Sequence, residues 1–334
     1  MPSAVNRVTI GMSTSSPQGR ILHLQRLSTE DGPGLRTTVF FKGCPLRCAW
    51  CHNPESLSRE LQTQWFGVRC IACDTCIATC PNGCLSRAAD GELVIDRTRC
   101  EACGKCAEAC PSGALEALGR LVNADELLAE LLKDRAYFDK SGGGVTLSGG
   151  EPTFQPDLAE VLLAGLKAQG ISTALDTCGL CSVRTLERLL PFTDLVLFDL
   201  KLADTQAHRH FTGMPNAPIL DNLRFLKTYA SQHPLEIWIR TPLIPGVTDA
   251  EENLQALGAI LAAGLDGSVQ RWELCAFNNL CRDQYHRLGL DWAYARTPLM
   301  SAAELESAGR AARRSGVRPE IVSTTGATRL EEEN

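Results

Sequence analysis

The stretch Phe40-Phe41-Lys42-Gly43-Cys44-Pro45-Leu46-Arg47-Cys48-Ala49-Trp50-Cys51 carries three cysteines at the spacing C-x3-C-x2-C. Residues 36–41 are mostly apolar, like a buried parallel strand, so the cysteines are expected on the loop that follows it. Three thiolates on one loop can hold three irons of a four-iron cubane, and the fourth iron then stays open for chemistry. The alternative is a structural zinc knuckle or idle thiols, but structural zinc takes four ligands, and the next cysteine opens a different pattern.

That second pattern fills residues 58–118 and repeats itself, as C-x2-C-x2-C-x3-C-P from Cys70 and again from Cys100. It matches the run of bacterial two-cluster ferredoxins, in which the fourth cysteine ligates the other cluster. By that rule one 4Fe–4S cluster is held by Cys70, Cys73, Cys76 and Cys110, and the other by Cys100, Cys103, Cys106 and Cys80. A zinc ribbon fits less well, because four thiols are crowded on one short piece of chain. Cys84 is left over and is expected to be a small buried thiol.

Composition limits the classes of protein that this chain can be. Its 334 residues are 44% hydrophobic and 22% charged, which is typical of a soluble globular protein with one large domain or two smaller ones. A net charge of −6 provides no electrostatic footprint for nucleic acid or a membrane. Sixteen cysteines without a signal peptide do not form a secreted disulfide framework. We therefore expect a cytoplasmic monomer whose thiols mostly bind metal.

Outside the insert the chain alternates helices and strands. Helices are predicted at 124–138, 158–169, 183–190, 219–229, 251–263 and 302–314, and strands at 144–148, 171–176, 195–200, 235–240, 270–275 and 318–322. This order predicts parallel strands with right-handed crossovers, that is, an α/β fold with an open partial (β/α)6 barrel. The barrel would span residues 21–57 and 119–325, with the insert at 58–118, a disordered leader at 1–20 and a flexible acidic tail at 326–334. Chemistry is expected at the carboxyl ends of the strands.

The segment from Leu27-Ser28 through Asp31-Gly32-Pro33-Gly34 and Arg36 to the three cysteines resembles the signature of radical S-adenosylmethionine (SAM) enzymes that activate glycyl radical enzymes. The run from Ser141 to Glu151 extends this resemblance, which covers about residues 20–325. The insert resembles that of a subgroup serving lyases, decarboxylases and benzylsuccinate synthase. The resemblance implies that SAM chelates the open iron and is cleaved by one electron to methionine and a 5′-deoxyadenosyl radical. That radical would take a hydrogen from a glycine Cα of the partner enzyme's C-terminal loop, with a flavodoxin or ferredoxin as electron donor.

The same resemblance implies roles for single residues. Gly149, Gly150 and Glu151 match a GGE motif whose glycines allow close approach and whose carboxylate accepts from the methionyl ammonium. The Trp50 backbone is expected to contact the adenine, and Arg240 is expected to pair with the cofactor carboxylate. The strand ends are expected to line the nucleotide and a monovalent cation through Asp176, Thr177, Asp199 and Lys201. For these residues a purely structural ion pair or turn is the alternative.

Four further expectations concern residues around this site. The family pattern Leu-Leu-Pro-Tyr-His reads here Leu274-Cys275-Ala276-Phe277-Asn278, so Asn278 can keep a hydrogen bond to the cofactor but not a charge. Asp31 matches a loop residue expected to meet the incoming glycine segment. His52 is expected to be a hydrogen-bonded loop histidine rather than a ligand. A third site is in principle possible at Cys178, Cys181, Cys275 and Cys281, but their irregular spacing favours ordinary buried thiols.

Two other functions remain open at this point. One is a radical SAM enzyme that acts on a small molecule and uses the extra clusters as a relay or a substrate anchor. The other is an electron-transfer protein, a ferredoxin with an enlarged scaffold. The GGE and DGPG elements argue against the second, because an electron carrier needs no cofactor pocket.

Overall fold

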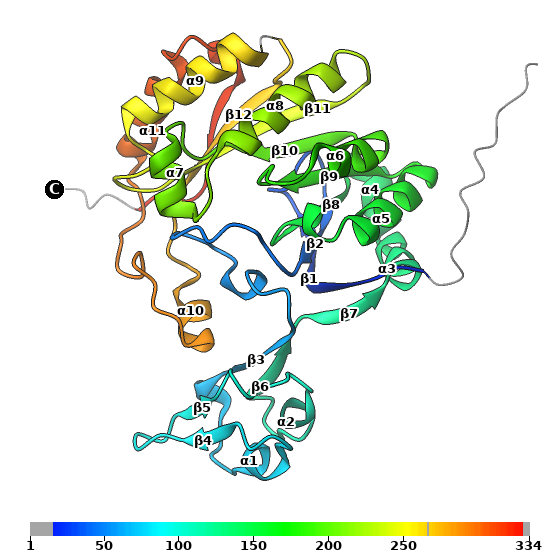
Figure 1. Ribbon diagram of the computed structural model, residues 1–334, viewed down its shortest axis with the longest axis vertical. Coiled ribbons are helices and arrows are strands. Elements are labelled where there is room, and N and C mark those ends of the chain that lie inside the picture. The colour runs from blue at the N-terminus through cyan, green and yellow to red at the C-terminus, as the bar shows by residue number, and fades with distance from the viewer. Residues whose placement is uncertain (1–15, 266, 330–334) are drawn as a thin grey trace, which may run out of the picture.

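The computed structural model describes residues 16–265 and 267–329. Within them, nine strands form one sheet in the order β13-β12-β11-β10-β9-β8-β2-β1-β7 (Figure 1). Seven of the strands run parallel: β2 (Arg36–Phe41), β8 (Gly144–Gly149), β9 (Ser172–Thr177), β10 (Leu195–Asp199), β11 (Glu236–Leu243), β12 (Arg271–Ala276) and β13 (Val322–Thr325). The other two strands are antiparallel: β1 (Gln18–Ser28) pairs with β2 on one side and with the edge strand β7 (Arg120–Asn123) on the other. The prediction of an α/β fold with parallel strands is confirmed.

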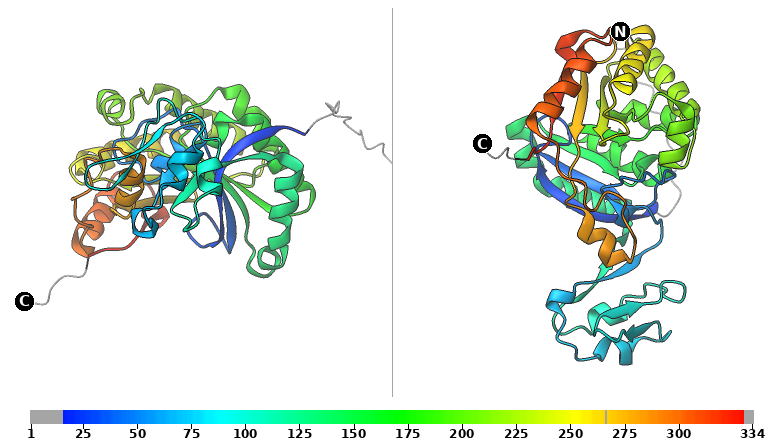
Figure 2. Two further views of the ribbon diagram at one scale, coloured as in Figure 1. Left: turned by 90° about the horizontal axis from the view of Figure 1, so that it is seen from below. Right: turned by 90° about the vertical axis from the view of Figure 1, so that its left-hand side faces the viewer.

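Helices cover the outer side of the curved sheet (Figures 1 and 2). They are α3 (Ala124–Leu131), α4 (Arg135–Ser141), α5 (Pro156–Ala168), α6 (Val183–Leu189), α8 (Ala217–Ala230), α9 (Glu251–Leu265) and α11 (Ala302–Arg313). Their apolar faces and the buried strands form two large cores, one around Phe198, Ile239 and Trp272 and one around Phe41 and Leu147. Two further helices, α7 (Thr205–Thr212) and α10 (Arg282–Leu288), lie next to the three-cysteine loop and were not predicted.

The amino ends of the parallel strands are held together by a buried arginine. Arg36 is 1% exposed, and it donates to Thr146 Oγ1 at 2.7 Å and to Val145 O at 2.8 Å. Burial lowers the pKa of Arg36 to about 10, although nearby Asp31 opposes the shift. Because this guanidinium sits at the opposite end of β2 from the cysteine loop, it fixes the strands without entering the site.

Four boundaries differ from the sequence-based prediction. The helix predicted over 124–138 is interrupted by a 3-10 turn at Leu132–Asp134, since the Asp134 carboxylate turns inward to accept from Thr37 Oγ1 at 2.8 Å. The final strand begins at Val322 rather than 318, because Pro319 opens a 3-10 turn and cannot donate to a ladder. Residues 18–20 of the predicted leader belong to β1, and Arg329 of the predicted tail forms a bridge with Ser301.

Part of those predicted termini cannot be compared with the structure: residues 1–15 and 330–334 lie outside the described residues.

The segment between β3 (Gln62–Trp65) and β6 (Leu115–Leu118) forms a small lobe below the sheet. It contains α1 (Thr75–Thr79), α2 (Lys105–Glu108) and the hairpin of β4 (Leu85–Arg87) and β5 (Leu93–Ile95). Leu85, Leu93 and Leu115 form its core together with several cysteines. Across the described residues, no helix combines the length and the apolarity that crossing a bilayer requires.

Candidate active site

A cavity of about 380 Å³ lies where the parallel strands end and the three-cysteine loop begins. This volume is in the range of small-molecule and cofactor pockets. The predicted site residues that line it are Cys44, Cys48, Trp50, Cys51, Gly149, Gly150, Asp199, Lys201, Arg240 and Asn278. Glu151, Asp176 and Thr177 are not among the lining residues, and Glu30 lines the cavity where Asp31 does not. Cys178 and Cys275, which the sequence analysis set aside as ordinary thiols, also line it.

The backbone of the cysteine loop is held by hydrogen bonds from α7 and from the region of α10. Arg47 N donates to Thr212 O at 2.8 Å and Ala49 N to Phe211 O at 2.8 Å, both at the end of α7. From the other side, Tyr285 OH on α10 donates to Cys51 O at 2.9 Å, and Trp292 Nε1 donates to Ala49 O at 3.1 Å. Sequence reasoning missed Tyr285 and Trp292, because neither lies in a motif and both act over more than 200 residues of chain.

The three thiols share one cavity wall but differ in their surroundings. Burial raises the pKa of Cys48 to about 11, and it raises the pKa of Cys51 as well. A hydrogen bond from the Cys178 thiol lowers the pKa of Cys44. Without metal, therefore, Cys48 and Cys51 are neutral, and coordination would release their protons. Three thiol donors on a loop with a charged cavity beside them fit an iron–sulfur cluster with one iron left open.

The two glycines after β8 are required by packing. A Cβ on Gly149 would lie 2.4 Å from Phe41 N, and one on Gly150 would lie 2.4 Å from Gly43 O. Gly149 also has a φ of +103°, which L side chains rarely adopt. These positions bring the β8 end against the start of the cysteine loop, so any side chain there would push the two apart.

Glu151 is fully buried, and its carboxylate is occupied within the chain. Oε1 accepts from Thr153 N at 3.0 Å, Thr153 Oγ1 at 2.7 Å and Thr177 Oγ1 at 2.9 Å, and Oε2 accepts from Cys178 N at 2.8 Å. The carboxylate therefore joins the end of β8 to the end of β9. This arrangement gives Glu151 four partners other than the methionyl ammonium expected from the resemblance.

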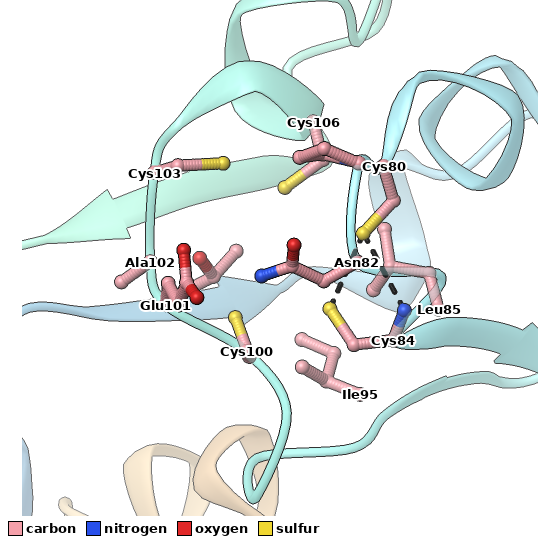
Figure 3. A pocket seen from close by; sticks show the side chains of 12 residues that line it. Cys80, Asn82, Cys84, Leu85, Ile95, Cys100, Glu101, Ala102, Cys103 and Cys106 are labelled. Carbon is pink, nitrogen blue, oxygen red and sulfur yellow. Dashed lines mark hydrogen bonds between the residues drawn. The ribbon is translucent and has the colours of Figure 1, made fainter.

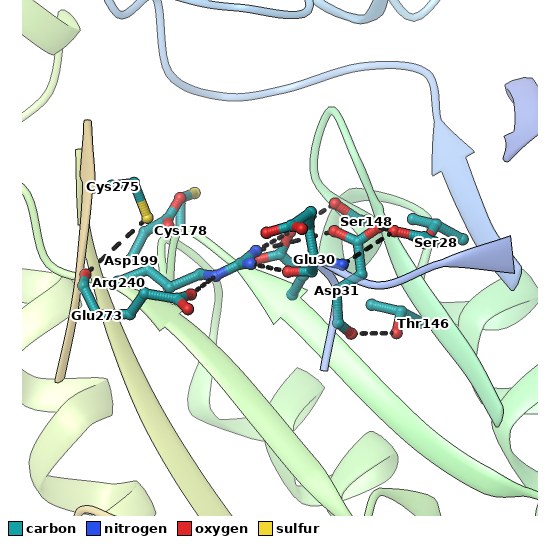
Figure 4. Close-up of polar contacts among 12 residues, drawn as sticks. Ser28, Glu30, Asp31, Thr146, Ser148, Cys178, Asp199, Arg240, Glu273 and Cys275 are labelled. Atoms are coloured by element: carbon teal, nitrogen blue, oxygen red, sulfur yellow. Dashed lines mark hydrogen bonds and ion pairs between the residues drawn. The ribbon is translucent and has the colours of Figure 1, made fainter. Parts of the chain in front are cut away.

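Arg240 lies at the centre of a polar network at the strand ends (Figure 4). Its Nε donates to Glu273 Oε2 at 2.9 Å, and Nη1 lies 3.7 Å from Asp176 Oδ2 and 3.9 Å from Asp31 Oδ1. Asp176 also accepts from Ser148 Oγ at 2.5 Å. Burial raises the pKa of Asp176 to about 7, although Arg240 opposes the shift. The guanidinium thus lines the cavity and at the same time joins the DGPG loop to three strands.

Lys201 and Asp199 form a buried ion pair on the cavity wall. Burial disfavours the ammonium, but the negative charge of Asp199, and that of Cys48 and Cys178 once they are thiolates, outweighs it and raises the pKa of Lys201. His52 and Asn278 also line the cavity, and His52 Nε2 lies 2.9 Å from Asn278 O, so His52 is the hydrogen-bonded loop histidine that the sequence predicted. Burial lowers the pKa of His52, so the ring is neutral and bridges the cysteine loop to the strand end that carries Asn278.

The small lobe holds two further groups of cysteines. Cys70, Cys73, Cys76 and Cys110 line one small pocket beside Trp65 and Arg87. Figure 3 shows the other pocket, which is lined by Cys80, Cys100, Cys103 and Cys106, with Cys84 as a fifth thiol. The Sγ atoms of Cys80 and Cys84 are 3.3 Å apart, and Cys84 is buried as predicted. Each set of four that the sequence analysis paired thus comes together in space.

Comparison with known proteins identifies the family. Residues 38–257 match the model of the radical SAM superfamily. The chain belongs to the radical SAM superfamily. Members of this superfamily use SAM and a 4Fe–4S cluster. The chain is 37% identical over 281 residues to the (2S)-3-sulfopropanediol dehydratase activating enzyme of Klebsiella oxytoca, covering 83% of this chain and 87% of that one.

A second relative narrows the family to which this radical SAM protein belongs. The chain is 42% identical over 276 residues to the isethionate sulfite-lyase activating enzyme of Oleidesulfovibrio alaskensis, covering 81% of this chain and 84% of the relative. It is therefore a member of the family of glycyl radical enzyme activating enzymes. Among solved structures, Streptococcus suis SuiB bound to the precursor peptide SuiA is similar with a TM-score of 0.50 and 14% identity, over 85% of this chain and 46% of that one. This last likeness concerns the fold alone.

Proposed function

We propose that this protein cleaves SAM at a 4Fe–4S cluster held by Cys44, Cys48 and Cys51, and activates a partner glycyl radical enzyme. Bound there, cluster and SAM supply one-electron cleavage to methionine and a 5′-deoxyadenosyl radical, which takes a hydrogen from the partner's glycine Cα. The observation that carries this proposal is the meeting of the three thiols with the charged strand ends at one cavity of about 380 Å³. The relatives, activating enzymes of a dehydratase and a sulfite-lyase, favour a lyase-type partner.

The residues around the cavity suggest how the site binds and orients SAM. Arg240 offers the cofactor carboxylate a cation that Glu273 already orients, and Lys201 with Asp199 offers a charged pair on the same wall. Gly149 and Gly150 present backbone to the cavity, and Trp50 and Asn278 line it where adenine and a polar cofactor group would lie. Glu151 and Thr177 position the ends of β8 and β9. Asp176 and Asp199 are candidates to bind a monovalent cation.

We also propose that the lobe is a ferredoxin-like domain with two more 4Fe–4S clusters, three in all. Its loops support this, because residues with positive φ, namely Ala72 and Asp74 in one repeat and Ala102 and Gly104 in the other, turn the chain around each pocket. Backbone N–H groups point at ligand sulfurs in both halves, from Cys84 N to Cys80 Sγ at 3.5 Å and from Ala114 N to Cys110 Sγ at 3.2 Å. The protein would work as a monomer in the cytoplasm, with a flavodoxin or ferredoxin as electron donor.

The open cluster is tested by Cys48→Ala. Anaerobically reconstituted, reduced protein is incubated with SAM, and 5′-deoxyadenosine is measured together with the glycyl radical signal of the partner encoded by a neighbouring gene. Loss of both products is expected, because two protein ligands cannot hold the cubane. Cys181→Ala is the matched control, since that thiol does not line the cavity. Product formation by Cys48→Ala at the wild-type rate would contradict the assignment.

The three-cluster proposal is tested by metal content. Four irons per 4Fe–4S site give about 12 irons per chain after anaerobic reconstitution. Saturation near four irons, with zinc accounting for the rest, would exclude the ferredoxin-like domain.

The lobe's role as an electron path is tested by comparing reductants. Cys73→Ala and Cys103→Ala change exposed cysteines of the two sets. If the lobe conducts electrons, both variants slow turnover much more with a protein reductant than with a small chemical reductant. Equal slowing with both reductants would instead indicate a structural role, and unchanged rates would indicate a role in partner recognition.

A further inference from the structure

The two cysteine pockets of the lobe arise from one internal repeat, but their surroundings are not equal. Placing Cys70 on Cys100 aligns Asp74 with Gly104 and Arg87 with Ala117. Asp74 and Arg87 can form an ion pair, whereas Gly104 and Ala117 cannot. The repeat therefore supplies its own comparison: the same backbone carries a charged pair at one pocket and small, uncharged residues at the equivalent positions.

Arg87 uses all three guanidinium nitrogens at the first pocket. Nε donates to Asp74 Oδ1 at 2.7 Å, Nη1 donates to Gly91 O at 2.8 Å, and Nη2 lies 3.6 Å from Cys70 Sγ. The first two bonds hold the planar group in place, and the third directs an N–H at a ligand sulfur. Asp74 has a φ of +57° and sits in the loop between two of the cysteines, so the chain's course around the pocket itself positions the carboxylate.

The other pocket has a different partner for its sulfurs. There the Cys84 thiol and its N–H face Cys80 Sγ, and within the described residues no arginine donates to the sulfur of Cys80, Cys100, Cys103 or Cys106. At the first pocket the Thr75 hydroxyl adds a further donor, 3.3 Å from Cys73 Sγ. Both pockets thus have neutral donors, and a cationic donor distinguishes the first.

The reduction potential of an iron–sulfur cluster depends on net charge and on hydrogen bonds to its sulfurs. A reduced cluster carries one more negative charge than the oxidised form, so a cationic N–H donor stabilises the reduced form more. We propose that Arg87, positioned by Asp74, tunes the cluster at Cys70, Cys73, Cys76 and Cys110 to be the more easily reduced of the two in the lobe. This inference rests on the proposed ferredoxin-like function of the lobe. It makes that cluster the place where a single electron entering the lobe comes to rest.

The test is a redox titration of the reconstituted full chain, followed by electron paramagnetic resonance, with iron content measured on each sample. Arg87→Ala copies the residue of the other half. We expect one of the three midpoint potentials to become more negative, while the other two and the iron content stay unchanged. Asp74→Asn keeps an acceptor for Arg87 but removes the compensating charge, so it should move that same potential in the positive direction.

Arg69→Ala is the matched control. It removes one positive charge from the same lobe, but Arg69 contacts Gly113 O, Glu116 and the Phe66 ring rather than a sulfur. An unchanged set of potentials in Arg87→Ala, or the same shift in Arg69→Ala, would overturn the inference. If Arg87→Ala loses four irons, its potentials cannot be compared with the wild type, and the test then rests on Asp74→Asn. An unchanged set of midpoint potentials in Asp74→Asn would overturn the inference. A wild-type chain with about four irons would instead refute the three-cluster proposal itself.

Discussion

Replacing Glu151 by alanine tests whether its carboxylate positions the strand ends or binds SAM. The side chain is fully buried and accepts four hydrogen bonds from within the chain. Two of the donors are hydroxyls, of Thr153 and Thr177, which can rotate to other acceptors. The other two are backbone N–H groups, of Thr153 and Cys178, which cannot.

The magnitude follows from those two fixed donors. Leaving a buried N–H without an acceptor costs about 1–3 kcal/mol, so two of them lower the free energy of unfolding by about 4 kcal/mol. For a domain of this size each kcal/mol lowers the melting temperature by about 2–4 °C, which gives a decrease of about 10 °C. The effect should appear without SAM, because every partner of the carboxylate belongs to the protein.

The assay is thermal unfolding of the reconstituted, SAM-free protein under anaerobic conditions, followed by circular dichroism at one scan rate. Glu187→Ala is the control, since Glu187 is an exposed glutamate on α6 and should leave the melting temperature nearly unchanged. If Glu151→Ala melts like the wild type and only SAM binding weakens, the carboxylate serves the cofactor and the reasoning from its four partners is wrong.

Two other predictions concern single side chains. Cys80→Ala should lower the saturating iron content, whereas Cys84→Ala, which copies Ala114 of the other repeat, should leave the iron content unchanged. An iron assay of both variants tests this, and an equal loss of iron in both would show that Cys84 is a ligand. Burial raises the pKa of the Asp176 carboxyl from 3.8 to about 7, so between about pH 4 and pH 7 it is mostly protonated in the folded protein but ionised in the unfolded chain. Its contribution to stability is therefore complete below about pH 4 and is lost as the pH rises through 7. Asp176→Asn should flatten this decrease in urea unfolding measured between about pH 5 and pH 8, and an unaltered slope would show that another group causes it.

Much of the fold could be predicted because its signals are local. The apolar run of β2, the alternation of strands and helices after residue 119, and the cysteine spacings each reflect a few neighbouring residues, so they predicted the parallel sheet and the two groups of lobe cysteines. Boundaries were less certain where a tertiary contact outweighs periodicity. Asp134 interrupts a helix because its partner Thr37 lies on a strand nearly a hundred residues earlier.

The sequence by itself determined which chemistry the chain can carry, because the number and spacing of thiols are properties of the chain alone. Only the tertiary structure decided how that chemistry is held. Tyr285 and Trp292 fix the cysteine loop, Arg240 joins the DGPG loop to the strand ends, and Glu151 binds donors from its own chain. The physical reason is that a hydrogen bond or an ion pair depends on positions within a few ångströms. Packing alone brings residues so far apart in sequence to that distance.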